Sequence, residues 1–294
     1  MRLLLLCLFG LLAACQSHHV LPPPAPIAPQ GRDHADLGMI RELATGRTLT
    51  PQQLVERLAS APRVLVGEQH DNPDHHALQL WLLRELAAQR PQGSLLMEML
   101  NPDQQARVDA AQAATRAGQP PADPYQALAW QANWDWSAYG ALVTYALGQP
   151  YPLLAANLDR AQIRQIYKQR PELTGDASTA PQVQATLLDD IRESHCGLLP
   201  EAQMPAMLAV QQQRDRGMAE RLLAAPTPAV LLAGAFHVRK DLGVPLHLKD
   251  LGAGEGNAVL VLAEVGKTVT AESADYVWYT AAQPAQDHCA KLRQ

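Results

Sequence analysis

Short apolar runs alternate with longer segments of helical period along most of the chain. The apolar runs lack the alternation of apolar and polar residues that a half-solvated sheet requires, so both faces of each run should be buried. This pattern predicts an α/β fold with a mostly parallel sheet flanked by helices. The predicted strands are RVLVGE (63–68), SLLMEM (94–99), YPLLAAN (151–157), AVLLAGAFH (229–237) and AVLVLAEV (258–265), with YVWYT (276–280) as a candidate sixth.

The segment between the first two predicted strands, residues 72–90, has the pattern of an amphipathic helix. Asn72 can cap its first turn, and Pro73 suits the first helical position. Steps of three and four residues place four apolar side chains on one face, namely Leu78, Trp81, Leu82 and Leu86. The two strands and this helix form a predicted βαβ unit.

Two longer stretches, about 101–150 and 182–225, have helical period without a convincing strand. We expect these helical insertions to form a smaller all-helical subdomain over one edge or end of the sheet. Without its first 35 residues the chain has about 260 residues, enough for one large domain. We therefore predict a single α/β domain over residues 36–294.

The first residues predict export. MRLLLLCLFGLLAAC has an apolar run too short to span a bilayer as a mature helix, and small residues precede Cys15. The tetrad LAAC resembles the lipobox of bacterial lipoproteins, which implies a signal peptide over residues 1–14 and a lipidated Cys15; an ordinary secretory signal is the alternative. Because Gln16 rather than Asp follows, we expect the periplasmic face of the outer membrane. Residues 15–35, rich in Pro and polar side chains, predict a flexible tether.

The charge of the chain argues against nucleic acid as a partner, and the cysteines bear on a disulfide and on a zinc site. The formal net charge is −5 and there is no basic run, so nucleic acid is not an expected partner. Cys196 and Cys289 lie in the predicted folded body. An oxidising periplasm would allow them to pair, although the sequence does not establish that their Cα atoms are close. Neither lies in a CxxC spacing, which disfavours a zinc site built on Cys.

Polar residues follow the apolar runs where the predicted strands end. They are Glu68 and His70, Glu98, Asn157 with Asp159 and Arg160, and His237 with Arg239. Because functional groups of an open parallel sheet gather at the carboxyl ends of its strands, we expect these side chains to share a rim. A helix cap or a satisfied buried group would explain any single one of them. The same feature at four strand ends indicates a site.

Seven blocks carry a family resemblance: VLVGEQHDNPDHHALQLWLLREL, LLMEML, WDWSAYGALVTYAL, YPLLAANLDR, SHCGLLP, QQQRDRGMAERL and VLLAGAFHVRKDLGVPLHL. In this order, between about residues 64 and 248, they resemble the ChaN-like haem-binding lipoproteins, within a superfamily that includes TraB, Tiki and erythromycin esterase. The resemblance implies a lipid anchor and haem binding for iron acquisition. It also implies a homodimer with two haems stacked between protomers, a Tyr phenolate on iron with His nearby, and an outer-membrane haem receptor as a partner.

Tyr139 is the predicted ligand of the haem iron. It lies in WDWSAYGALVTYA, where the family block carries a Tyr. Trp136, three residues earlier in a predicted helix, would offer an apolar wall beside the haem. A core Tyr with its hydroxyl at the surface is the alternative, and the other candidate ligands are Tyr145, Tyr125 and Tyr151.

Two further residues fall in family blocks. His195, in SHCGLLP, could face haem or its propionates, or could close a helix C-terminus beside Gly197. In QQQRDRGMAERL, Arg214 and Met218 share a helical face, while Asp215 is turned away by about a quarter turn. Arg214 could therefore bind an anion or pair with a strand-end Glu; a surface salt bridge is the simpler alternative.

Two GxxH elements suggest a second function from a different class. GEQH ends at His70 and GAFH ends at His237. In Tiki-like and erythromycin esterase relatives, such elements serve hydrolysis together with a Glu. Two neutral imidazoles with Glu68 and Glu98 would suit zinc or manganese that activates a water molecule. The alternative function is thus a metal-dependent hydrolase, or a metal-free one in which Glu98 orients His70 as a general base.

Overall fold

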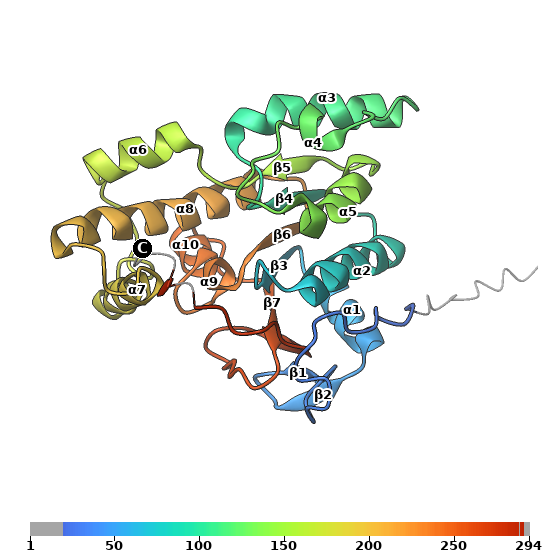
Figure 1. Ribbon diagram of the computed structural model, residues 1–294, viewed down its shortest axis with the longest axis horizontal. Coiled ribbons are helices and arrows are strands. Elements are labelled where there is room, and N and C mark those ends of the chain that lie inside the picture. The colour runs from blue at the N-terminus through green and yellow to red at the C-terminus, as the bar shows by residue number, and fades with distance from the viewer. Residues whose placement is uncertain (1–19, 288, 291–294) are drawn as a thin grey trace, which may run out of the picture.

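The structure is a computed structural model that describes residues 20–287 and 289–290. Its strands form one eight-stranded sheet in the order β2-β1-β8-β7-β3-β6-β4-β5 (Figure 1). All six predicted strands are present, and they run parallel to one another. They are β3 Arg63–Glu68, β4 Ser94–Met97, β5 Leu153–Ala155, β6 Ala229–Gly234, β7 Asn257–Glu264 and β8 Tyr276–Thr280. The predicted α/β fold with a mostly parallel sheet is confirmed.

An antiparallel hairpin at one edge of the sheet is absent from the sequence-based prediction. Strands β1 Ile40–Glu42 and β2 Arg47–Leu49 pair with each other, and β1 also pairs antiparallel with β8. Each has only three residues, too few for a strand period to be recognised in the sequence. The hairpin makes the sheet mixed and covers the edge of β8.

One face of the sheet is covered by five helices, which share one hydrophobic cluster with the sheet. Val64 and Val66 of β3 belong to this cluster, together with Leu86 of the predicted helix. That helix is capped as predicted, because the Asn72 side chain accepts a hydrogen bond from the backbone N–H of Asp74. The helices are α1 Pro51–Ala59, α2 Pro73–Gln89, α3 Gln105–Arg116, α4 Pro124–Ala127 and α5 Trp136–Leu147, with a 3₁₀ turn at Pro102–Gln104 before α3.

The opposite face packs against α8, α9 and α10. Leu65 of β3 and Leu231 of β6 point to this side and share a cluster with Met218 and Leu222 of α8. Consecutive residues of β3 thus enter different clusters, as expected for a strand buried on both faces. The helices are α8 Met204–Ala224, α9 Ala235–Val238 and α10 Val244–Asp250, with a 3₁₀ turn at Glu201–Gln203 before α8.

The two predicted helical insertions therefore lie on opposite faces of the sheet. The expectation that they come together over one edge or end of the sheet is wrong. A smaller helical part does extend beyond the sheet, where α6 Arg160–Gln169 and α7 Pro181–Ser194 lie along α8 (Figure 1). It has its own small hydrophobic cluster, in which Val183 and Leu187 of α7 pack with Leu242.

Residues 20–35 pack on the body of the protein. Ala28 is buried, and the backbone N–H groups of Ile27 and Ala28 donate to the Asp74 carboxylate at the start of α2. Trp81 donates from Nε1 to the carbonyl oxygen of Leu21. The expectation of a flexible tether is therefore wrong for residues 20–35. The predicted signal peptide and Cys15 lie outside the described residues.

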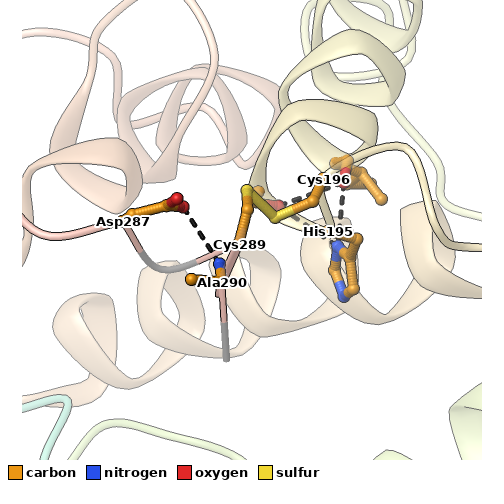
Figure 2. Close-up of a disulfide and its surroundings, with 7 residues drawn as sticks. His195, Cys196, Asp287, Cys289 and Ala290 are labelled. Atoms are coloured by element: carbon orange, nitrogen blue, oxygen red, sulfur yellow. Dashed lines mark hydrogen bonds between the residues drawn. A yellow bond between two sulfur atoms is a disulfide. The ribbon is translucent and has the colours of Figure 1, made fainter. Parts of the chain in front are cut away.

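Cys196 and Cys289 form a disulfide with their Cα atoms 5.6 Å apart (Figure 2). The pairing that the sequence left open is thus present, and it ties the C-terminal tail to the end of α7.

In the part of the chain that the structure describes, no helix is both long and apolar enough to cross a bilayer.

Candidate functional site

The carboxylate of Glu68, at the end of β3, holds two neighbouring side chains. Glu68 is buried, and its Oε1 lies 2.8 Å from Nδ1 of His70. The same oxygen accepts a hydrogen bond of 2.6 Å from the hydroxyl of Tyr139. Oε2 lies 3.2 Å from Nδ1 of His76, without hydrogen-bond geometry. A strand-end carboxylate thus orients an imidazole from the next loop and a phenol from α5.

His70 is the accessible member of this group, with 44% of its side chain exposed. Burial disfavours the charged ring, but the hydrogen bond to Glu68 and the charges of Glu98 and Glu68 outweigh it and raise the pKa of His70. In the neutral tautomer with its proton on Nδ1, His70 donates to Glu68 and keeps a lone pair on Nε2. That nitrogen can bind a metal or accept a proton.

Tyr139 lies beside Glu68 but has almost no access to solvent. Its exposed fraction is 1%, and its ring packs edge-on against His76, with centroids 4.5 Å apart. Burial raises the pKa of Tyr139 above its usual range, and the negative charge of Glu68 raises it further. In this geometry the hydroxyl is a hydrogen-bond donor. The predicted role of Tyr139 as iron ligand requires that its bond to Glu68 be replaced.

His237 lies between two carboxylates at the end of β6. Its Nδ1 is 2.5 Å from Oδ1 of Asp215, and its Nε2 is 3.3 Å from Oε1 of Glu98. The second Glu98 oxygen accepts a hydrogen bond of 2.8 Å from the Gly234 N–H. Burial disfavours the imidazolium, but the two carboxylates outweigh it and raise the pKa of His237 to about 10. Burial likewise opposes the charge of Glu98, yet His237 lowers its pKa to about 2. His237 is thus a buried cation between two anions.

The two groups meet because β3 and β6 are neighbouring strands, with Glu68 opposite Gly234. A Cβ placed on Gly234 would lie 3.0 Å from Nε2 of His70 and 3.6 Å from Oε2 of Glu98. Because Gly234 has no side chain, the His70 ring can approach the Glu98 carboxylate. The structure therefore brings Glu68, His70, Glu98 and His237 to one rim of the sheet.

A cavity of about 210 Å³ opens above this rim, next to α7, α8 and α9. His70, Gln211 and His237 contribute polar groups to its wall. Its apolar surface comes from Leu187, Ile191, Phe236 and Leu242. Pockets for drug-sized ligands are commonly about 300–1,000 Å³, so this cavity would cover only part of a larger ligand.

The aromatic neighbour of His70 is Trp134. Its ring lies edge-on to His70, with centroids 4.9 Å apart, and 5.9 Å from the ring of Tyr139. Trp136, which the sequence placed beside the haem, instead packs on Trp130 and Tyr125. The difference arises because α5 begins at Trp136, so that Trp134 belongs to the preceding turn and not to the helix.

His195 and Arg214 do not contact the rim cluster. His195 caps the C-terminus of α7 next to Cys196 (Figure 2). Its Nδ1 lies 2.8 Å from the carbonyl oxygen of Ile191, which supports the helix C-terminus interpretation. Arg214 is half-buried and forms no ion pair within residues 20–287 and 289–290, so neither the pairing with a strand-end Glu nor the surface salt bridge that the sequence allowed is present. Its binding of an anion stays a prediction. Asp215, which the sequence analysis set aside, is the α8 residue that reaches His237.

The remaining strand-end residues support the backbone around the rim. Asn157 donates from Nδ2 to the carbonyl oxygen of Glu98, and Asp159 caps α6. Arg239 donates to both carboxylate oxygens of Asp241. These residues have the structural roles that the sequence allowed as alternatives.

The rim does not fit a zinc or manganese ion. Both ring nitrogens of His237 face carboxylates, Nδ1 that of Asp215 and Nε2 that of Glu98, so neither is directed at a free position where a metal could bind. Within the described residues, no group of three or more His, Cys, Asp or Glu side chains is arranged to hold a metal ion. The metal-free alternative also needs a correction, because Glu68 rather than Glu98 orients His70.

A family model and one solved structure identify the family of this chain. The family model described as "Haem-binding uptake, Tiki superfamily, ChaN" matches residues 54–248, more than half of the chain. The solved structure titled "Cofacial heme binding to ChaN of Campylobacter jejuni" is 28% identical, with a TM-score of 0.74 over 82% of this chain and 95% of that chain. A mutant of erythromycin esterase EreC in its open conformation is 12% identical, with a TM-score of 0.48 over 86% of each chain. A search of curated proteins finds no significant match.

Proposed function

Because the chain belongs to the ChaN family of haem-binding uptake proteins in the Tiki superfamily, we propose that it binds haem at the rim of Glu68, His70, Glu98 and His237. The observation that carries the proposal is the accessible imidazole of His70, oriented from behind by the buried Glu68. Metal-binding His residues commonly donate their second ring nitrogen to such a carboxylate. Haem, when bound, supplies an iron that takes an axial protein ligand such as His or Tyr.

The donor to iron is one of the two side chains that share Oε1 of Glu68. We propose His70, because 44% of its side chain is exposed and its Nδ1 faces Glu68, which leaves Nε2 for a ligand, whereas the Tyr139 hydroxyl is buried and already donates to Glu68. Tyr139 is the donor that the family resemblance implies. It takes that role only if α5 shifts and iron replaces the hydrogen bond.

We propose that two copies of the chain enclose the haem together. The cavity beside His70 is about 210 Å³, smaller than the pockets that enclose drug-sized ligands. One chain would therefore leave much of a porphyrin exposed, and a second copy would cover it. Cofacial haem binding in the Campylobacter jejuni ChaN structure supports this arrangement. Because no metal triad fits the rim, hydrolysis by zinc or manganese is not proposed.

We propose that Cys15 carries a lipid that anchors the protein to the outer membrane on its periplasmic face, where an outer-membrane haem receptor would exchange haem with it. The Cys196–Cys289 disulfide supports an oxidising compartment, since such bonds persist there and are rare in the cytosol. The His70, lipid and dimer parts of the proposal are independent of one another.

A hemin titration followed by sedimentation velocity tests the proposed function. Saturable hemin uptake with a shift from monomer to dimer is expected. Absence of saturable uptake would remove haem binding from the account. Uptake by a chain that stays monomeric at saturation would remove only the shared site.

A further inference from the structure

Helix α9 exposes the aromatic side chain of Phe236 to solvent, while the next two residues of the helix are firmly held. Val238 is fully buried and packs so closely over Gly67 that a Cβ there would lie 2.4 Å from a Val238 methyl carbon. His237 is held between its two carboxylates. Phe236, immediately before it, is 62% exposed. Since its neighbours are anchored, Phe236 cannot turn inward without displacing them.

Phe236 stands between two hollows at the carboxyl ends of the strands. On one side is the cavity of about 210 Å³ that contains His70. On the other is a hollow of about 400 Å³ at the end of β7, which also contains Gln69 and Lys267. Gln69 and His70 are consecutive residues, so the β3 loop borders both hollows. A flat ligand that spans both hollows must pass over Phe236.

The hollow at the end of β7 contains two cations, Arg239 and Lys267, and the carboxylate of Glu264. Its Arg239 donates to both carboxylate oxygens of Asp241, at 3.0 and 2.6 Å. Its Glu264 accepts hydrogen bonds from Asn72, Gln69 and Gln283. Lys267 is exposed and forms no ion pair within the residues that the structure describes.

Hydroxyl groups surround the same hollow. They belong to Thr268, Thr270 and Ser273. Two of these hydroxyls are already engaged, since that of Ser273 donates to the carbonyl oxygen of Thr270 and that of Thr270 bonds to Glu272. The exposed ammonium of Lys267 suits a carboxylate at the edge of a ligand, because it supplies both charge and N–H donors.

We infer that Phe236 is the platform over which the porphyrin plane of haem lies, and that Lys267 binds a propionate carboxylate of the same molecule. The inference rests on the proposed haem function and adds the residues that orient the ligand. An aromatic ring offers a flat apolar contact to the macrocycle. The hollow on the His70 side contains the proposed iron donor, whereas the hollow on the other side contains the exposed ammonium of Lys267. The two hollows thus offer one contact for the iron and one for a carboxylate of haem.

The test compares hemin with hemin dimethyl ester, in which both carboxylates are neutral, on the full-length chain in detergent. Phe236→Ala should weaken binding of both compounds about tenfold, because the lost contact is apolar. Lys267→Ala should weaken hemin about fivefold and leave the ester unchanged, because only the charge contact is removed. Leu251→Ala and Lys249→Ala, an exposed apolar and an exposed cationic residue of the α10 region, are matched controls that should bind as the wild type does.

The possible outcomes distinguish a failure of this inference from a failure of the proposed haem binding. If the wild type takes up hemin and neither variant differs from it, the platform is wrong and haem binding stands. Equal loss of hemin and ester affinity in Lys267→Ala would overturn the carboxylate contact. If the wild type shows no saturable hemin uptake, the function and the inference both fail.

Discussion

Gly234 sits directly beneath His70: a Cβ at this glycine would lie 3.0 Å from Nε2 and 2.9 Å from Cε1 of the imidazole. The backbone of Gly234 has φ −57° and ψ 147°, which alanine adopts without strain. Gly234→Ala should therefore push the His70 ring aside without removing any donor atom from the rim. We expect about tenfold weaker hemin binding, measured by titration.

Gly148→Ala is the control for that experiment, because its Cβ would meet only the carbonyl oxygen of Tyr145 at 3.5 Å. Both variants should unfold in urea within about 0.5 kcal/mol of the wild type, since the half-exposed His70 can move. Equal hemin affinity in Gly234→Ala and the wild type would show that His70 is not the group facing the iron.

Because His237 is held between the carboxylates of Asp215 and Glu98, we predict that the protein loses stability at alkaline pH. The pKa of His237 is raised to about 10 in the folded chain, against about 6.5 for an ordinary His. Between these values the folded state binds one proton more than the unfolded state. The stabilisation is therefore complete below pH 6.5 and falls as pH rises towards 10, by at most about 1.4 kcal/mol per pH unit.

Urea unfolding at several pH values measures this effect. His237→Gln has no proton to lose, so its unfolding free energy should show a smaller slope than that of the wild type between pH 6.5 and 10. His34→Gln, at an exposed site, should keep the slope of the wild type. Parallel curves for His237→Gln and the wild type would mean that His237 is neutral in the folded protein.

The disulfide predicts sensitivity to reductant. Cys196 and Cys289 are 93 residues apart, so the bond closes a long loop, and residues 284–287 before Cys289 are exposed. Loss of the bond should lower the free energy of unfolding by about 2–4 kcal/mol. Urea unfolding with and without dithiothreitol measures this loss, and the double variant Cys196→Ser/Cys289→Ser should not respond to the reductant. If the urea midpoint of the wild type stays the same in dithiothreitol, the disulfide that holds the C-terminal tail adds no stability.

The buried parallel strands and α2 could be predicted because their signals are local. Continuous apolar runs mark strands covered on both faces, and Asn72 with Pro73 marks a helix start. The β1–β2 hairpin could not be predicted from the sequence, since its strands have three residues each. The packing of residues 20–35 was also missed, because a proline-rich composition does not reveal that the Asp74 carboxylate binds the backbone of Ile27.

The rim could be predicted as a location but not as a set of contacts. Because β3 and β6 are parallel neighbours, their carboxyl ends lie at the same rim, and the observed register places Glu68 opposite Gly234, three residues before His237. The partners of these residues come from other elements, 71 residues away for Glu68 and Tyr139 and 22 for Asp215 and His237. Helical period gave the correct angle between Arg214 and Asp215, but it could not tell which of them faces the sheet.

A hemin titration with absorption spectra of the wild type, His70→Ala and Tyr139→Phe tests the central claim most directly. His70→Ala should lose the iron-bound spectrum and bind hemin at least tenfold more weakly, while Tyr139→Phe should keep an imidazole-ligated spectrum; His34→Ala, an exposed His outside the rim, should match the wild type. A high-spin ferric phenolate spectrum that survives in His70→Ala and disappears in Tyr139→Phe would contradict the account.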